Sequence, residues 1–161
     1  MTDHRIIAIT LDESTIVKWN ATIENERQIA VNDLLEENSF QPLRLNGDTA
    51  NTGPYKVHLS INDGRLVFDL KNESDMPLDS FYLSITPFRK IIKDYFVICE
   101  SYYNALKSAT PLHMEAIDMG RRGIHNEGGD ILKELLRKKA LVDFDTARRL
   151  FTLICVLHLK G

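Results

Sequence analysis

The segment from Ile117 to Gly129, IDMGRRGIHNEGG, has residue types and spacing that could bind an anion, with four glycines and five ionisable side chains in thirteen residues. Glycine is costly inside a helix, so Gly120 and Gly123 indicate a helix break or the close approach of another backbone or a ligand. Backbone N–H groups freed at such a turn, beside two guanidinium forks, would form a cradle for phosphate or carboxylate. We therefore expect an anion-binding corner at Gly120–Gly129, with these ligand-binding residues: Gly120, Arg121, Arg122, Gly123, His125 and Glu127.

Two other interpretations of this segment stay open. In the first, the helix continues through it, and Asp118 and Arg122 form an i,i+4 ion pair on a solvated face. In the second, the run GRRG at residues 120–123 is similar to the GXXG loop with which KH domains hold a nucleic-acid backbone. Four residues are a weak match, and the glycine pair at 128–129 interrupts the apolar spacing expected after a KH loop.

The rest of the sequence gives no pattern typical of a metal, a cofactor or a catalytic centre. A metal site would draw on the acids and histidines between His113 and Glu127, but no two histidines stand at i,i+4 and HExxH is absent. Cys99 and Cys155 lie far apart without a CxxC motif, so we expect two free, buried thiols. A G-x-S-x-G elbow is also missing, so no catalytic residue is assigned.

The elements that must position these residues begin with a predicted sheet of about four strands and one helix at residues 23–37. The strands are expected at residues 5–11, 55–61, 66–70 and 81–85. The first is almost continuously apolar, which is typical of a central strand covered on both faces. The second and third alternate on either side of Asn62-Asp63-Gly64, which predicts a hairpin, and a polar loop over 71–80 precedes the fourth.

After residue 86 the apolar period changes from two to about 3.6, which predicts about four C-terminal helices. They are expected at 87–107, from 111 into Gly120, at 130–139, and from Asp143 or Asp145 to near His158. Thr-Pro pairs at 86–87 and 110–111 supply N-caps followed by a proline that the first helical position tolerates. Residues 150–157 are apolar around nearly the whole helix, so we expect either a buried helix or a homodimer through the Leu150–Leu157 helix.

Composition and charge set the class of protein. A chain of 161 residues, 43% hydrophobic and 27% charged, predicts a single α+β domain over residues 1–161, with an antiparallel or mixed sheet packed against the helices. Targeting and membrane-spanning patterns are both missing, so we expect a cytoplasmic protein. Residues 1–80 carry a net charge of −7 and residues 81–161 of +4, which suits a small anionic ligand but is too weak to favour nucleic acid.

Three stretches resemble a known family: PFRKIIKDYFVICESYY, IDMGRRGIHNEG and VDFDTARRLFTLICVLH. Through them the chain is similar, over nearly its full length, to a small proteobacterial group described only as an uncharacterised protein family. The resemblance implies a cytosolic, single-domain protein, and it implies no activity, cofactor or partner.

The function favoured by these observations is a non-catalytic, cytosolic ligand- or partner-binding module with its anion-binding corner at Gly120–Gly129. One alternative is a small enzyme acting on a phosphorylated or carboxylated metabolite, with His125 or Glu127 transferring a proton beside the arginines. Another alternative is RNA binding through the GRRG run. A deep pocket at this segment would favour the enzyme, and a flat basic or apolar face would favour the module.

Overall fold

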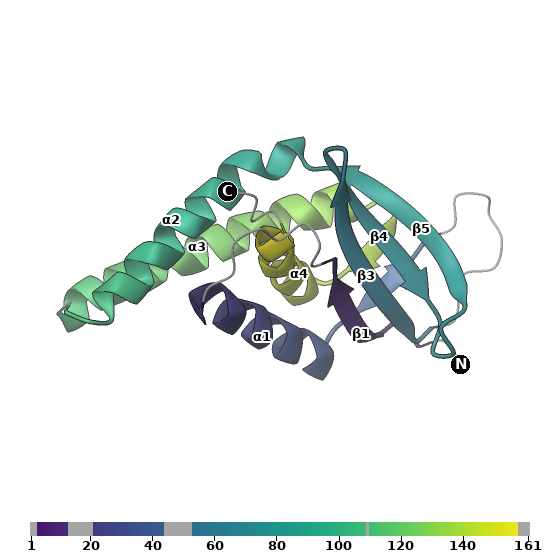
Figure 1. Cartoon of the computed structure of the whole chain (residues 1–161), viewed down its shortest axis with the longest axis horizontal. Helices are drawn as coiled ribbons and strands as arrows, with labels where there is room; N and C mark the ends of the chain where they lie inside the picture. Colours follow the sequence, from purple (N-terminus) through teal and green to yellow (C-terminus); the bar gives the residue numbers. More distant parts are fainter. Residues whose placement is uncertain (1–2, 13–20, 44–52, 109, 158–161) are drawn as a thin grey trace.

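The protein has an α+β architecture, as predicted, in which a mixed four-stranded sheet is followed in the chain by three long helices (Figure 1). The structure is a computed structural model and describes residues 3–12, 21–43, 53–108 and 110–157. The order of strands is β1-β3-β4-β5, with β1 (Ile6–Leu11) parallel to β3 (Tyr55–Asn62) and the other neighbours antiparallel.

The predicted hairpin is present as β3 and β4 (Arg65–Lys71), joined by a turn in which Asp63 and Gly64 have φ values of 53° and 73°. These positive values explain why the turn needs an Asp-Gly pair. Alternate residues of β3 and β4 are buried, so one face of the sheet packs on the core and the other face is turned to solvent.

Two predictions about the strands are wrong. The strand β1 lies at the edge of the described sheet rather than at its centre, and its middle residues are half-buried or exposed. The strand β5 (Pro77–Ser84) begins within the predicted loop over 71–80, because its first half pairs with β4 although its side chains there are mostly exposed. In addition, β2 (Phe40–Pro42) pairs with β6 (Ala140–Val142) in a two-stranded sheet, and three-residue strands are too short to give an alternation signal.

The helices are α1 (Ala21–Glu36), α2 (Arg89–Ala105), α3 (Pro111–Leu136) and α4 (Phe144–Leu157), with a 3₁₀ turn, η2 (Thr86–Phe88), before α2. In Figure 1, α2 and α3 run side by side away from the sheet as a long helical hairpin. The α3 helix begins at the predicted cap, since the Thr110 hydroxyl accepts a hydrogen bond from the His113 N–H at 3.2 Å. The third and fourth predicted helices are a single helix of 26 residues, so the expected break at Gly120 is wrong.

The last helix, α4, is the centre of the core. Asp143 caps it, accepting a hydrogen bond from the Thr146 N–H at 2.9 Å, which agrees with one of the two predicted caps; the predicted end at His158 lies outside the described residues. Each residue from 150 to 157 is at most 3% exposed, because α1, α3 and the sheet surround the helix. Its all-round apolar composition is therefore explained by burial inside one chain, and while these residues stay covered they cannot supply a dimer interface. Homodimer formation itself stays a prediction.

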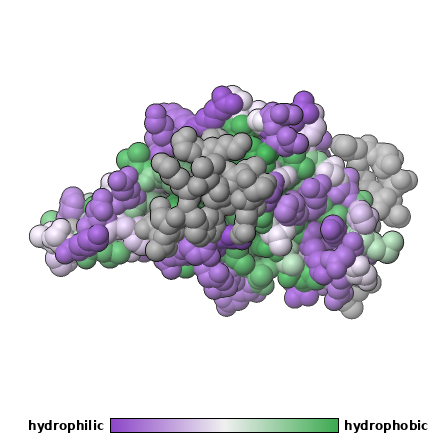
Figure 2. Space-filling view, viewed as in Figure 1, coloured by the Kyte–Doolittle hydropathy of each residue, from purple (hydrophilic) through white to green (hydrophobic). Residues whose placement is uncertain are grey.

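The surface of the protruding helical hairpin mixes polar side chains with exposed apolar ones, as Figure 2 shows at the narrow end of the molecule. Leu106, Leu112 and Met119 are 56%, 78% and 67% exposed there. Among the described residues, no helix is long and apolar enough to cross a membrane.

Candidate functional site

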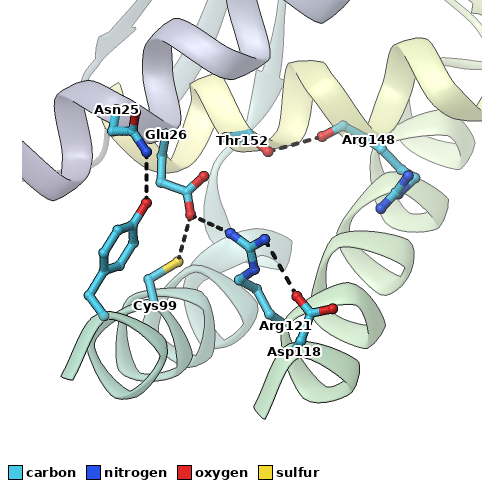
Figure 3. Close-up of polar contacts among 8 residues, drawn as sticks. Asn25, Glu26, Cys99, Asp118, Arg121, Arg148 and Thr152 are labelled. Carbon is cyan, nitrogen blue, oxygen red and sulfur yellow. Dashed lines mark hydrogen bonds and ion pairs between the residues drawn. The ribbon is translucent and has the colours of Figure 1, made fainter. Parts of the chain in front are cut away.

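A buried carboxylate, Glu26 on α1, is the centre of the polar contacts between three helices (Figure 3). Its side chain is 5% exposed, and its Oε1 accepts a hydrogen bond from Arg121 Nη1 on α3 at 2.9 Å. The thiol of Cys99 on α2 donates to the same oxygen, with an S···O distance of 3.6 Å. Because a buried carboxylate is stable only when it is paired and hydrogen-bonded, these contacts tie α1 to both other helices.

The guanidinium group of Arg121 is held on further sides as well. Its Nη2 lies 3.6 Å from Asp118 Oδ1, and its central carbon lies 4.3 Å from the centroid of the Tyr102 ring. The Arg121 side chain is only 24% exposed and points between the helices, as Figure 3 shows. The carboxylates of Glu26 and Asp118 therefore already balance the charge of Arg121. The hypothesis of an anion-binding corner did not predict this structural role of Arg121.

The segment 120–129 does not form the predicted corner, because α3 runs through it without a break. Its backbone N–H groups are in the helix rather than freed by a turn, so neither the anion cradle nor a KH-type loop is present in the predicted form. The interpretation as a continuous helix is the correct one: Arg122 is 71% exposed and its Nη2 lies 3.0 Å from Asp118 Oδ2. Gly123 and Glu127 are exposed too, on the outward side of the helix.

The buried glycines of this segment serve helix packing. A Cβ at Gly128 would lie 2.5 Å from atoms of the Phe151 ring, and a Cβ at Gly129 would lie 2.6 Å from Arg148 Cγ. Both neighbours belong to α4, so these two glycines let α4 approach α3 closely. Gly123 differs, since nothing lies within 4 Å of the Cβ position there.

A pocket of about 140 Å³ lies between α1, α3 and α4, next to the Glu26 cluster. Its polar lining is partly cationic, with Arg148 and Arg149 from α4 opposite Asp33 from α1, and His125 is contributed by α3. The complete lining is Glu26, Ile29, Ala30, Asp33, His125, Arg148, Arg149 and Thr152. Of the six predicted ligand-binding residues, only His125 therefore lines this pocket.

Two nitrogen atoms of the pocket residues are buried without a hydrogen-bond partner among the described residues, His125 Nε2 and Arg148 Nε. Such groups are rare in folded proteins and call for an explanation, for example a bound water or ligand. Two other polar groups of the lining are engaged: Arg149 Nη1 donates to the Glu37 carbonyl at 3.0 Å, and the Thr152 hydroxyl donates to the Arg148 carbonyl at 3.3 Å. The guanidinium carbon of Arg148 also lies 5.9 Å from the centroid of the Phe144 ring.

The imidazole of His125 is neutral at pH 7. Burial, and to a smaller extent the guanidinium groups of Arg121 and Arg148, together lower the pKa of His125 to about 4. Its ring packs on Tyr95, with centroids 5.3 Å apart. A neutral imidazole can give or accept a hydrogen bond, but a base with a pKa of about 4 is poorly matched to proton transfer near pH 7.

Neither cysteine is activated as a nucleophile. Both are free and buried, as predicted. Burial, together with the nearby carboxylate of Glu26, raises the pKa of Cys99 to about 12, so the thiolate is strongly disfavoured. Burial also raises the pKa of Cys155 well above its ordinary value. Neither thiol is therefore suited to act as a nucleophile near pH 7.

Sequence reasoning missed most of the residues that make this region. Glu26 was not singled out from the sequence, although it follows Ile23 by three positions and precedes Ala30 and Leu34 on the apolar face of α1. An acid at that helical spacing is the signal that could have found it. Arg148 and Arg149 carry no local signal, because they reach α1 and α3 only after the chain has folded. Within the described part of the chain, no group of three or more His, Cys, Asp or Glu residues is placed to hold a metal ion.

Comparison with known proteins gives full-length matches that carry no activity. The model of the uncharacterised protein family UPF0262 matches residues 3–160. A UPF0262 protein of Erythrobacter litoralis is 53% identical, over 100% of both chains, and one of Xanthobacter autotrophicus is 55% identical over 98% of this chain and 93% of its own. A third, from Rhodospirillum rubrum, is 54% identical over 99% and 95%. No solved structure matches the chain.

Proposed function

The chain belongs to the uncharacterised protein family UPF0262, for which no function is known, and we propose that it is a non-catalytic, cytosolic module that binds a small anionic ligand in the pocket between α1, α3 and α4. The observation that carries the proposal is a pair of buried nitrogens, Arg148 Nε and His125 Nε2, that have no hydrogen-bond partner in the described part of the chain and lie beside a second guanidinium group on Arg149.

The chemistry of the pocket favours an oxyanion of small size. An oxygen of a carboxylate or phosphate can accept from Arg148 Nε in a charge-assisted hydrogen bond, and the neutral His125 can donate to a second oxygen. A volume of about 140 Å³ has room for a phosphate-sized group and not for a large metabolite. The corner first predicted on the surface of the helix is thus replaced by a site on its inner side, with only His125 in common.

The geometry gives the two alternative functions little support. An enzyme would use His125 or Glu127 for proton transfer, but the pKa of His125 is about 4 and Glu127 is exposed on the opposite side of α3. RNA binding through the GRRG run would need a loop, and these four residues are helical. The binding module therefore remains the function best supported.

The proposal is tested by thermal unfolding in inorganic phosphate and in sulfate, each compared with chloride at equal ionic strength. The decisive variant is Arg148→Met, which keeps the aliphatic stem packed against Gly129 and removes the guanidinium group. A ligand that binds only the folded state raises its stability by about 2.7 kcal/mol at a concentration of 100 times Kd. We expect such a rise for the wild type and its loss in Arg148→Met.

The control is Arg122→Met, because Arg122 lies on the outward side of α3 and does not line the pocket. It should keep the full response to phosphate. A wild type that phosphate and sulfate stabilise no more than chloride would exclude the site. A response lost in Arg122→Met and kept in Arg148→Met would return the site to the surface of α3.

A further inference from the structure

The pocket between α1, α3 and α4 is lined by acids as well as bases, and the two kinds come from different helices. The acids, Glu26 and Asp33, belong to α1, whereas the arginines, Arg148 and Arg149, belong to α4. Glu26 and Asp33 are seven positions apart, so they lie on one face of α1, with about 10 Å between them along the helix axis. A single cationic partner therefore does not balance both carboxylates.

The two acids differ in what already balances their charge. Glu26 is 5% exposed, and Arg121 Nη1 lies 2.9 Å from its carboxylate. Asp33 is exposed, and its carboxylate forms no ion pair with any residue that the structure describes. Asp33 is therefore the acid of this pocket that stays available to a cationic group of a ligand.

The arginines of α4 form no ion pair with an acid in the described part of the chain. Arg149 Nη1 donates to the Glu37 carbonyl at 3.0 Å, and a carbonyl accepts a hydrogen bond without neutralising the charge. The guanidinium group of Arg148 lies apart from the pair of Glu26 and Arg121, as Figure 3 shows. The charges that face the pocket without a counter-charge are thus two positive ones on α4 and one negative one on α1.

We propose that the ligand of this pocket carries a primary ammonium group in addition to its oxyanion, an inference that rests on the proposed function. The oxyanion accepts from Arg148 and His125, and the ammonium group donates to the carboxylate of Asp33 on the facing helix. The apolar side chains of Ile29 and Ala30 line the same pocket and suit the carbon chain between the two charged groups. Each charged group of the ligand thereby meets a charge of opposite sign.

The chemical class that fits this arrangement is a short aminoalkyl carboxylate or aminoalkyl phosphate. A volume of about 140 Å³ excludes long chains and large side groups. A simple carboxylate or phosphate would satisfy the arginines and leave Asp33 without a partner. The ammonium group therefore adds specificity to a site whose affinity for the oxyanion comes from α4 and α3.

Two pairs of probes isolate the ammonium group, with binding to the full chain measured by titration calorimetry. Beta-alanine is compared with propionate, and phosphoethanolamine with ethyl phosphate, because only the amine differs within each pair. We expect the amine of each pair to have a dissociation constant about tenfold lower, since it adds a charge-assisted hydrogen bond to Asp33. The two pairs also distinguish the oxyanions, because the pair that binds more tightly identifies the group.

The decisive variant is Asp33→Asn, which keeps the size of the side chain and removes its charge. It should bind propionate and ethyl phosphate at least as tightly as the wild type does, and it should lose the preference for the amines. The control is Glu36→Gln, because it removes another exposed acid from α1 that does not line the pocket. This control should keep the preference of the wild type.

The outcomes separate this inference from the proposed function. Equal binding of both members of each pair, lost in Arg148→Met, would leave the anion site in place and overturn the ammonium site. A preference for the amines that Asp33→Asn retains would overturn it as well. Absence of binding by all four probes also overturns it, and the proposed function falls too if phosphate and sulfate fail to stabilise the wild type.

Discussion

The inward and outward faces of residues 120–129 of α3 carry the same residue types, but these residues make different contacts. Its inward face contacts α1, α2 and α4 and includes Arg121, His125, Gly128 and Gly129. Its outward face is in solvent and includes Arg122, Gly123 and Glu127. On the inward face an arginine and glycines contact other helices, whereas on the outward face Arg122 pairs with Asp118 of its own helix and Gly123 has open space beside it. The face of the helix, not the residue type, therefore decides what each residue does.

The largest expected difference between the faces concerns the arginines. Arg121→Ala leaves Glu26 buried without its partner, so we expect a loss of about 3–5 kcal/mol in the free energy of unfolding. Arg122→Ala removes an exposed pair and should cost about 0–1 kcal/mol. Urea denaturation of both variants measures the difference. Two equally small losses would contradict the assignment of Arg121 as a structural residue, and a double variant with Glu26→Ala should recover part of the loss.

A pH dependence should separate His125 from Glu127. The folded pKa of His125 is about 4, below its ordinary value of 6.5, because the ring is buried beside Arg121 and Arg148. As the pH falls, the unfolded chain therefore binds a proton at this histidine before the folded chain does. The contribution of His125 to the free energy of unfolding is fully present above pH 6.5 and is lost as the pH is lowered to about 4. The difference corresponds to a loss of about 3 kcal/mol.

The measurement is the free energy of unfolding of wild type and His125→Asn as a function of pH. The variant should lack the part of the fall that lies between pH 6.5 and 4, while Glu127→Gln on the outward face should keep it. Parallel curves for wild type and His125→Asn would show that the imidazole is not buried in its neutral form.

The buried glycines give the next largest effect. The methyl group of Gly128→Ala would lie 2.5 Å from the Phe151 ring, and α4 would have to move away from α3 to accommodate it. We expect a loss of about 1–3 kcal/mol, typical of an overpacked core. Thermal unfolding measures it, and an unchanged midpoint would mean that the two helices are not in close contact.

The smallest effect has the opposite sign. Gly123→Ala adds a methyl group where nothing lies within 4 Å, and alanine is the better helix former. The variant should therefore be more stable by about 0.5–1 kcal/mol. Its calorimetric midpoint should exceed that of the wild type, and a lowered midpoint would reveal a contact at Gly123 that the chain makes only in solution.

The sequence predicted the fold better than the site, for physical reasons. The β3–β4 hairpin and α2 were found because their apolar periods are local and regular. The continuity of α3 was only one of the interpretations left open, because its glycines have low helix propensity and packing on α4 outweighs that preference. The edge position of β1 was missed too, since a run of apolar residues does not distinguish a central strand from a partly covered edge.

The site depends on partners that are distant in the chain. Glu26 and Arg121 are 95 positions apart, and no local pattern joins them. One signal was nonetheless present: the positions 121, 125, 128, 132 and 136 follow helical spacing, and the last two are the buried leucines of α3. Extending that stripe backward would have placed Arg121 and His125 on the inner side and Arg122 on the outer side.

The position of α4 in the chain order has a consequence for biosynthesis. The ribosome makes this helix after every element that it packs against, so the inner faces of the sheet, α1 and the α2–α3 hairpin leave the ribosome before the segment that covers them. Because translation proceeds at about 5–20 residues per second, these apolar surfaces stay exposed for seconds before α4 is available to cover them. We expect the nascent chain to depend on chaperones during this interval, and a premature stop before residue 144 to produce an aggregating fragment rather than a smaller folded protein.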